Sequence, residues 1–120
     1  MLITVCRGKL NRIAVTHKSV AYHGSITVDA EILELLGVVP NEKVLVVNLD
    51  TGGRFETYVE AGKFGSRCCI LNGGAAYQGE VGQDIGFITF GQLELEEAAE
   101  FVPKVIEVKP GGKIVRLKGF

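Results

Sequence analysis

The 120-residue chain lacks a long apolar run and lacks a net charge of any size, and each absence excludes a class of protein. Its opening, "MLITVC", stays apolar for only six residues before Arg7, which is too short for the core of a signal peptide or for a membrane span. A formal net charge of −1 provides no global field that would gather nucleic acid or a membrane surface. We therefore expect neither nucleic acid nor a membrane among its partners.

Cysteine is also scarce, and the three that occur, Cys6, Cys68 and Cys69, form no disulfide framework. Adjacent cysteines are awkward to bridge, and on a strand they point to opposite faces. No second pair or spaced histidine accompanies them, so we expect no zinc site. We interpret them as buried small hydrophobic side chains in a reducing cytoplasm. An enzyme that uses Cys68 or Cys69 as its nucleophile stays open as an alternative.

The composition fits one folded domain over residues 1–120, because 47% of the residues are hydrophobic and no linker, repeat or low-complexity segment interrupts the chain. Charge is unevenly distributed along it. Residues 1–24 carry four basic and no acidic residues, whereas residues 25–120 carry nine basic and fourteen acidic ones. The hydrophobic content also favours burial by self-association.

Apolar and polar residues alternate with a period of two along most of the chain, which is typical of β-strands. Glycine-rich turns are predicted at 49–53, 72–74 and 110–112. One helix is predicted over 29–37, with Asp29 as its N-cap and Gly37 as its stop, and a second over 93–101. Many short strands and 16 glycines favour a mainly β fold, a small closed barrel with short helices. The predicted strands span 2–6, 11–17, 26–28, 43–48, 54–60, 66–72, 84–90, 103–108 and 113–117.

The stretch "YHGSITVD" (22–29) places Gly24 directly before Ser25, at the start of a β-branched strand. The simplest interpretation is a tight turn. In a strained turn, however, the Ser25 hydroxyl can attack the preceding carbonyl, because glycine has no Cβ to block the approach. β-Elimination of the resulting ester, followed by hydration and loss of ammonia, leaves a pyruvoyl group. That ketone forms a Schiff base with an amino acid and accepts electrons as carbon dioxide leaves, as pyridoxal phosphate does elsewhere.

Six short segments at a consistent spacing carry a resemblance to a known family. They are "GKLNR" (8–12), "VTH" (15–17), "YHGSITVD" (22–29), "GRFETY" (53–58), "GSR" (65–67) and "NGGAA" (72–76). Together they resemble the aspartate 1-decarboxylases, pyruvoyl-dependent enzymes that cleave themselves and make β-alanine for pantothenate synthesis. The resemblance runs from residue 1 to about residue 108 without insertion.

The resemblance implies a closed six-stranded double-psi β-barrel and a homotetramer with active sites between subunits. It implies L-aspartate as the substrate. It also implies cleavage between Gly24 and Ser25 into a β chain of residues 1–24 and an α chain of residues 25–120. The cofactor would be the pyruvoyl group made from Ser25, with neither a metal nor pyridoxal phosphate.

Individual roles follow from the resemblance residue by residue. Ser25 matches the cofactor precursor. Tyr58 matches the proton donor that acts after decarboxylation, and a phenol can deliver a proton without adding a charge. Arg54 matches the residue that binds a substrate carboxylate, for which a guanidinium fork is suited. Thr57 lies on the opposite strand face from both, so its matched role near the cleavage site is expected to need a bend or a neighbouring subunit.

The remaining matches are a turn and a lysine. The backbone N–H groups of the turn are expected to meet the substrate and the cleavage oxyanion, and the turn comprises Asn72, Gly73, Gly74 and Ala75. Lys9 is the matching basic residue of the N-terminal strand. Asn11 stands where a histidine is common in the family, and Gly74 where an alanine is usual. His23 is interpreted as solvent-facing beside a turn, and Gly86 as the mark of a β-bulge.

Two other interpretations stay open. One is a non-enzymatic β-barrel module that binds DNA through a basic N-terminal arm. The charge of residues 1–24 favours it, while the overall charge and the lack of a basic stripe elsewhere oppose it. The other is a decayed enzyme that keeps the fold and no longer cleaves itself. The appearance of two fragments divided between residues 24 and 25 distinguishes both from an active decarboxylase.

Overall fold

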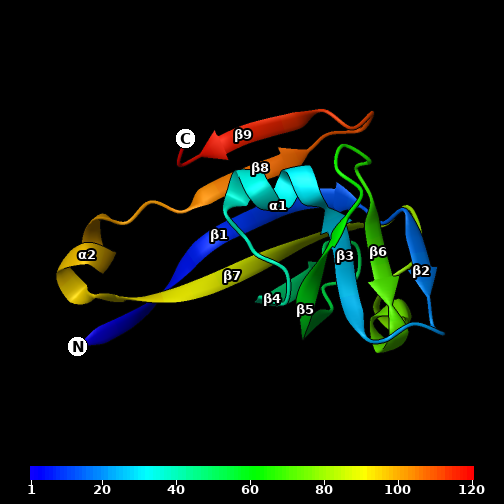
Figure 1. Cartoon of the computed structure of the whole chain (residues 1–120), viewed down its shortest axis with the longest axis horizontal. Helices are drawn as coiled ribbons and strands as arrows, with labels where there is room; N and C mark the ends of the chain where they lie inside the picture. The colour runs from blue at the N-terminus through cyan, green and yellow to red at the C-terminus, as the bar shows by residue number, and fades with distance from the viewer.

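The computed structural model describes residues 1–120 and is organised around a nine-stranded sheet in the order β2-β6-β3-β5-β4-β7-β1-β8-β9 (Figure 1). Two short α-helices, α1 (Ala30–Leu36) and α2 (Leu95–Glu100), and the 3₁₀ helix η1 (Gly73–Gln78) complete it. The mainly β class with short helices is therefore confirmed. The strands are β1 (Leu2–Ala14), β2 (His17–Ser19), β3 (Ser25–Asp29), β4 (Lys43–Asn48), β5 (Arg54–Gly62), β6 (Cys69–Asn72), β7 (Asp84–Glu94), β8 (Lys104–Val108) and β9 (Ile114–Lys118).

The first strand is longer than the sequence pattern predicts, because β1 includes the expected strand at 2–6 and residues 11–14 of the one expected at 11–17, whose last residue, His17, begins β2. At Gly8, β1 runs close beside α1 and β8, because a Cβ there would lie 3.5 Å from Leu36 O and 3.8 Å from Lys104 O, which is ordinary contact distance. β1 pairs antiparallel with β7, and this long ribbon carries α2 and the N-terminus at its far end (Figure 1).

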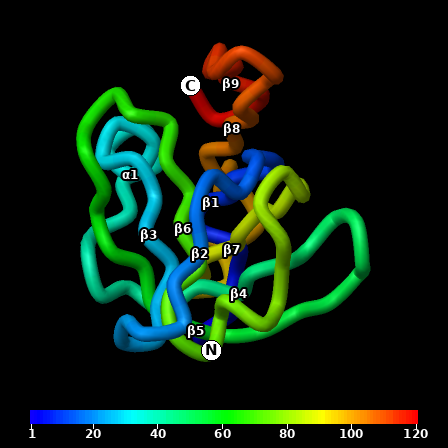
Figure 2. The backbone as a smooth tube through the Cα atoms, turned by 90° about the vertical axis from the view of Figure 1, so that its right-hand side faces the viewer, coloured from blue at the N-terminus to red at the C-terminus, as the bar shows by residue number.

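The hydrogen-bonded order ends at β2 and at β9, so the sheet is open and the predicted closed ring is not present as a continuous ladder. The β8–β9 hairpin lies beyond β1, away from β3, β5 and β6 (Figure 2). Between β1 and β2 the backbone changes partner. Val15 N donates to Gln83 O at 2.9 Å, and Thr16 N donates to Cys69 O at 2.8 Å. The first strand therefore leaves β7 and joins β6 at residues 15–16.

One hydrophobic cluster of 19 buried residues fills the interior. α1 contributes Ile32, Leu33 and Leu36 to it, with Asp29 as N-cap and Gly37 at φ +70° as the C-terminal stop, as predicted. The shorter α2 buries none of its residues. No helix in the chain has the length and the apolar character that a membrane span requires.

The position of β3 determines where the chemistry lies. β3 is parallel to β5 on one side, with Ile26 opposite Val59, and antiparallel to β6 on the other, with Ser25 opposite Asn72. Ile26 and Val28 point into the core, so the alternate residues Ser25 and Thr27 face the other way. Ser25 is thus the first residue of an internal strand and not part of an exposed turn.

Candidate active site

The hydroxyl of Ser25 is buried and held by a single side chain. Ser25 is 1% exposed and Asn72, its cross-strand partner, is 4% exposed. Asn72 Nδ2 donates to Ser25 Oγ at 3.1 Å and to Thr27 Oγ1 at 2.9 Å. The hydroxyl that could attack the Gly24 carbonyl therefore has a fixed position and accepts a hydrogen bond there.

Gly73 packs directly against the backbone that leads into Ser25. Its φ of +59° lies in the left-handed region, and a Cβ at this position would lie 2.7 Å from both Gly24 N and Tyr22 O. Only glycine permits that approach. The segment 72–74, which the sequence predicts as a hairpin turn, instead begins the 3₁₀ helix η1. Gly74 is different from Gly73, because nothing lies within 4 Å of a Cβ built on it.

A hollow of about 290 Å³ opens beside the Gly24–Ser25 bond. Its lining includes Gly24, Thr57, Gly74 and Ala75. Thr57 lies on the face of β5 that also carries Phe55, which packs against the core, and the buried Val59. Thr57 therefore lines the hollow at Gly24 within its own chain. Its expected role toward the substrate, on the opposite strand face from Arg54 and Tyr58, stays a prediction.

The other face of β5 carries Arg54 and Tyr58. Arg54 lines a separate hollow of about 170 Å³ together with Lys9 and Asn11. Tyr58 is half-buried and lies opposite Lys43 of β4. Neither Arg54 nor Tyr58 lines the hollow at Gly24. One chain thus gathers the predicted site residues into two groups on opposite faces of β5.

The structure adds Asn48, which the sequence pattern had included only as the last residue of a strand. Asn48 is buried, and its Nδ2 donates to Gln78 O and to Gln83 Oε1, each at 3.0 Å. Its Oδ1 accepts from Asp50 N at 2.9 Å and from Thr51 N at 3.1 Å. Asn48 therefore joins the end of η1 to the turn that precedes β5. The only sequence signal is an asparagine before the turn "LDTGG", which is common to many turns.

Asp29, at the end of β3, is a buried carboxylate with four donors. It accepts from the backbone N–H of Glu31 at 2.9 Å, of Gly65 at 2.8 Å and of Arg67 at 2.6 Å, and from Arg67 Nη1 at 3.0 Å. Burial alone would raise the pKa of Asp29, but the N–H donors and the guanidinium outweigh it and lower the pKa. This cluster fixes the junction between β3 and α1.

The cysteines and the residue types that can bind a metal ion are the alternative candidates for a reactive site. Cys68 and Cys69 are buried, as predicted, whereas Cys6 is only partly buried, and none of the three forms a disulfide. Burial, with Cys68 beside it, raises the pKa of Cys69 far above the usual range, so Cys69 stays a thiol and is not a nucleophile. Nowhere in the chain do three or more histidine, cysteine, aspartate or glutamate side chains form a group that could hold a metal ion.

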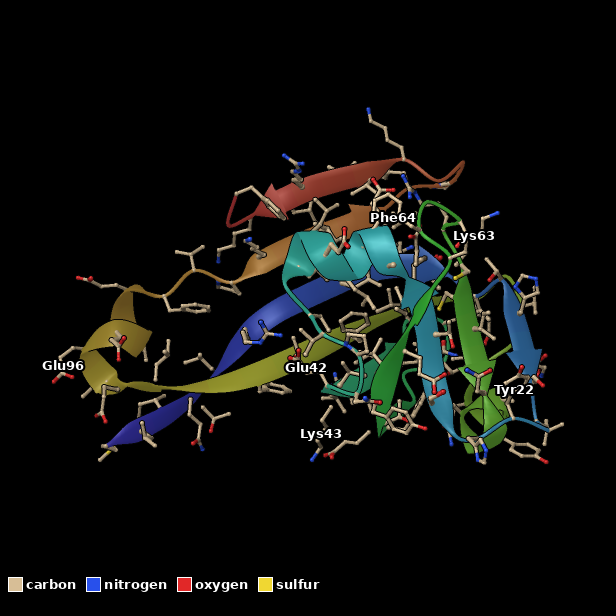
Figure 3. All side chains as sticks on the ribbon, in the orientation of Figure 1. Tyr22, Glu42, Lys43, Lys63, Phe64 and Glu96 are labelled. Atoms are coloured by element: carbon tan, nitrogen blue, oxygen red, sulfur yellow. The ribbon has the colours of Figure 1, made fainter.

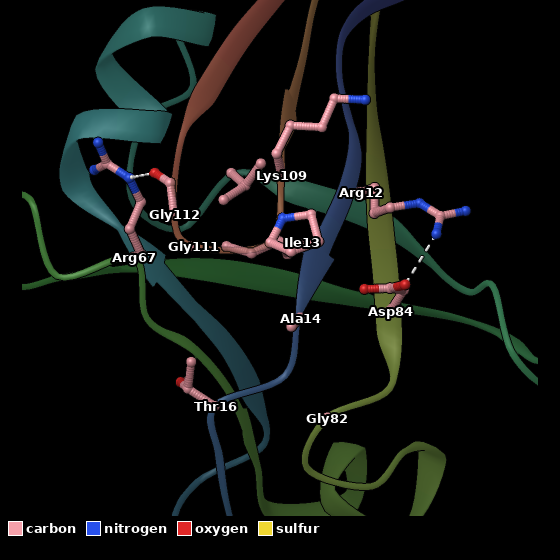
Figure 4. Close-up of a pocket in the computed structure, with 12 residues that line it drawn as sticks. Arg12, Ile13, Ala14, Thr16, Arg67, Gly82, Asp84, Lys109, Gly111 and Gly112 are labelled. Atoms are coloured by element: carbon pink, nitrogen blue, oxygen red, sulfur yellow. Dashed lines mark hydrogen bonds and ion pairs between the residues drawn. The ribbon is translucent and has the colours of Figure 1, made fainter.

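A different hollow, of about 450 Å³, lies between β1 and the turn after β8 (Figure 4). Its cations are already engaged. Arg12 pairs with Asp84 at 2.9 Å, and Arg67 Nε donates to Gly112 O at 2.6 Å. The hollow shares no residue with the one at Gly24. The hollow beside Gly24, lined by β5 and η1, is therefore the candidate active site.

Comparison with known proteins points to one family. The family model described as "Aspartate decarboxylase" matches residues 1–115. A protein of Carboxydothermus hydrogenoformans named "Aspartate 1-decarboxylase" is 42% identical, over 98% of this chain and 93% of its own length. Proteins of the same name from Caldicellulosiruptor saccharolyticus and Staphylococcus aureus are 44% and 42% identical, each over 98% of this chain and over 91% and 92% of their own lengths.

Proposed function

Since the chain belongs to the aspartate decarboxylase family, we propose that it removes the α-carboxylate of L-aspartate as carbon dioxide and makes β-alanine for pantothenate synthesis. The observation that carries the proposal is the buried Ser25 hydroxyl, which Asn72 holds at 3.1 Å at the start of β3. Gly73 packs against the chain just before it. This arrangement fits a serine that is to be converted into a pyruvoyl group.

The chain cuts itself between Gly24 and Ser25. Ser25 Oγ forms a bond to the Gly24 carbonyl carbon, the Gly24–Ser25 amide bond breaks, and the hydroxyl proton ends on the Ser25 nitrogen. Loss of the Ser25 Cα proton with cleavage of the Cβ–Oγ bond then releases the Gly24 carboxylate. One water replaces the nitrogen as ammonia leaves. The products are a β chain of residues 1–24 and an α chain of residues 25–120 that begins with the pyruvoyl group.

The pyruvoyl group supplies the electron sink for decarboxylation, without a metal or pyridoxal phosphate. The chain's own residues do the rest. Thr57 and the backbone of Gly74 and Ala75 line the space beside the reacting carbon. Arg54, with Lys9 in the same hollow, binds the β-carboxylate that aspartate keeps. Tyr58 donates the proton that replaces the lost carboxylate.

The separation of these groups supports a homotetramer with active sites between subunits. The Arg54 hollow and the Gly24 hollow share no lining residue, and Arg54 and Thr57 lie on opposite faces of β5, so a complete site would join one subunit's Arg54 hollow to the next subunit's Gly24 hollow. Large side chains near the cleavage hollow are exposed for a partner to cover: Tyr22 is 69% and Tyr77 is 76% exposed. Tyr22 lies at the end of the molecule where β2 and β6 end (Figure 3).

A closed six-stranded double-psi barrel is the form we propose for the body of the sheet. The partner change at Val15 and Thr16 supports it, because it joins β1 and β2 into one strand that pairs with β7 at one end and with β6 at the other. The ring would then run through β6, β3, β5, β4, β7 and this combined strand. The β8–β9 hairpin lies outside it.

Ion pairs between the two fragments neutralise most of the positive charge of residues 1–24. Arg7 pairs with Glu42, Arg12 with Asp84 at 2.9 Å, and Lys18 with Glu80 at 2.7 Å. Three of the four basic side chains of residues 1–24 are thus neutralised by acids beyond the cut. This arrangement holds the fragments together and leaves little of the arm's charge for DNA, so the DNA-binding interpretation is disfavoured.

Denaturing mass spectrometry of the purified protein tests the proposal. The expected result is two fragments divided between residues 24 and 25, with the larger one beginning in a pyruvoyl group, together with production of β-alanine from L-aspartate. The Ser25→Ala variant should remain a folded, intact chain that makes no β-alanine. A wild-type chain that stays intact on long incubation would contradict the proposal and favour the decayed enzyme.

A further inference from the structure

We propose that Thr27 is a positioning residue for self-cleavage, which acts by holding the Asn72 amide so that it presents an N–H to Ser25 Oγ. This inference rests on the proposed function, since it concerns how fast the Gly24–Ser25 bond is cut. Thr27 touches neither that bond nor the hollow beside it in the contacts described above. Its influence would pass through Asn72.

The geometry places the three side chains together on one face of two paired strands. Ser25 and Thr27 are two residues apart on β3, and Asn72 lies on β6 opposite Ser25. A single amide nitrogen serves both hydroxyls, with Nδ2 at 2.9 Å from Thr27 Oγ1 and 3.1 Å from Ser25 Oγ. An amide carries two hydrogens on that nitrogen, so each hydroxyl accepts one. Removing the Thr27 acceptor would leave Asn72 fixed from one side only.

Glu60 gives this chain of hydrogen bonds its direction. β3 and β5 are paired with Thr27 opposite Glu60, and the Thr27 hydroxyl donates to Glu60 Oε2 at 3.4 Å. A carboxylate can only accept, so the Thr27 hydrogen points to Glu60 and its lone pairs face Asn72. Asn72 must then turn its nitrogen, and not its oxygen, toward both hydroxyls. Glu60 therefore determines, through Thr27 and Asn72, that Ser25 Oγ accepts a hydrogen bond and does not donate one to Asn72.

That polarity matters for the cut. Because Ser25 Oγ accepts from Asn72, its own hydrogen is not committed to the amide and can leave when Oγ bonds to the Gly24 carbonyl carbon. One oxygen lone pair is occupied by Asn72 and the other remains for the attack. With the amide reversed, Asn72 Oδ1 would hold the serine hydrogen and leave Oγ in the wrong orientation. Reaction rates are sensitive to such displacements, at about 10²-fold for 1 Å.

The test measures the rate constant of Gly24–Ser25 cleavage in freshly synthesised protein by denaturing mass spectrometry, and separately the turnover of aspartate per cleaved chain. Thr27→Val, which keeps the shape and removes the hydroxyl, should slow cleavage about 10-fold, the worth of one hydrogen bond. Turnover per cleaved chain should stay within about threefold, because Thr27 acts before the cofactor exists. Thr27→Ser, which keeps the hydroxyl, should cleave at close to the wild-type rate.

The chain offers a matched control in Thr89. This residue is also buried, and its hydroxyl also donates to a carboxylate, that of Glu42, away from the cleavage site. Thr89→Val therefore reports the effect of losing a buried hydroxyl alone, and it should cleave at the wild-type rate. Thermal unfolding of every variant identifies any that fail to fold.

Glu60→Gln provides a second, independent variant. Its side-chain amide can donate a hydrogen bond to Thr27 Oγ1, so the Thr27 hydroxyl would no longer be restricted to donating toward residue 60 and accepting from Asn72. We expect this variant to slow cleavage while turnover per cleaved chain is kept. If Thr27→Val and Glu60→Gln both cleave at the rate of Thr89→Val while the wild type matures normally, this inference is overturned and the proposed function stands. If the wild type does not cleave, the proposed function itself fails.

Discussion

Replacing Gly73 by alanine should block maturation far more than it disturbs the fold. The added Cβ would lie 2.7 Å from Gly24 N, 2.7 Å from Tyr22 O and 2.8 Å from Gly24 Cα. An unstrained carbon contact needs about 3.5 Å, so these backbone atoms must move by roughly 0.8 Å. They belong to the segment that would present the Gly24 carbonyl to Ser25 Oγ in the proposed cleavage. A displacement of this size in a reacting group lowers a rate by about 10²-fold.

The same substitution also has a conformational penalty. Alanine at φ +59° costs about 1–2 kcal/mol relative to glycine, and the contact with Gly24 adds to it. We expect the free energy of unfolding to fall by about 2–5 kcal/mol, which lowers the melting temperature by about 10 °C or more. Gly74→Ala is the matched control, because nothing lies within 4 Å of its Cβ and its φ is not positive.

The assay follows the fraction of chains cleaved between residues 24 and 25 over time by denaturing mass spectrometry, with thermal unfolding measured on the same samples. Gly73→Ala should mature about 10²-fold more slowly than the wild type. Gly74→Ala should mature normally and change stability by less than about 0.5 kcal/mol. A Gly73→Ala chain that is folded and matures at the wild-type rate would show that the close approach of η1 does not position the bond.

Three further outcomes are expected. Tyr58→Phe should cleave normally but make β-alanine about 10²-fold more slowly, since it loses only the proton donor; failure to cleave would give the hydroxyl a role in maturation as well. Arg54→Ala should sharply raise KM or abolish activity, with partial rescue in Arg54→Lys, whereas unchanged kinetics would move the carboxylate anchor to Lys9. Asp29 has a lowered pKa when folded, so its contribution to stability is present above its unfolded pKa of about 3.9 and is lost as the pH falls through the folded pKa. Denaturant titrations should show wild-type stability falling below about pH 4, with a weaker fall in Asp29→Asn; equal slopes would remove Asp29 as the acid-sensitive group.

Local signals predicted those elements whose ends are determined by nearby residues. The Asp29 cap and the Gly37 stop gave α1 its correct limits, because both act through the backbone of the helix itself. β4 was predicted at its observed bounds from the alternation of residues 43–48. Gly86 was expected to mark a bulge, and two residues of β1, Asn11 and Arg12, indeed lie opposite this one residue of β7. A Cβ at Gly86 would lie 2.5 Å from Leu10 O, which explains the glycine.

Features that depend on contacts between residues far apart in the sequence could not be predicted from local sequence signals. Gly73 reads locally as part of a hairpin turn, and only the approach of Gly24 shows why its backbone is left-handed. Which face of β5 lies beside Gly24 depends on the parallel pairing of β3 with β5, and alternation alone does not reveal that pairing. Thr27 reads as one of three β-branched strand residues. Its link to Ser25 exists only because β6 brings Asn72 alongside.

The place of β1 within the sheet has a consequence for the stability of the protein if the proposed cleavage occurs. β1 lies between β7 and β8, with partners on both edges, yet under the proposed cleavage it would belong to a separate chain of residues 1–24. Unfolding of an uncut subunit would yield one polypeptide. Unfolding of a cut subunit would yield two, which would add a dependence on protein concentration beyond that of subunit association. Rebuilding the mature form from its separated pieces is an assembly reaction in which a central strand must find its slot without a covalent tether. We therefore expect folding to precede the proposed cleavage, so that the mature form would keep an arrangement that its precursor reached as a single chain.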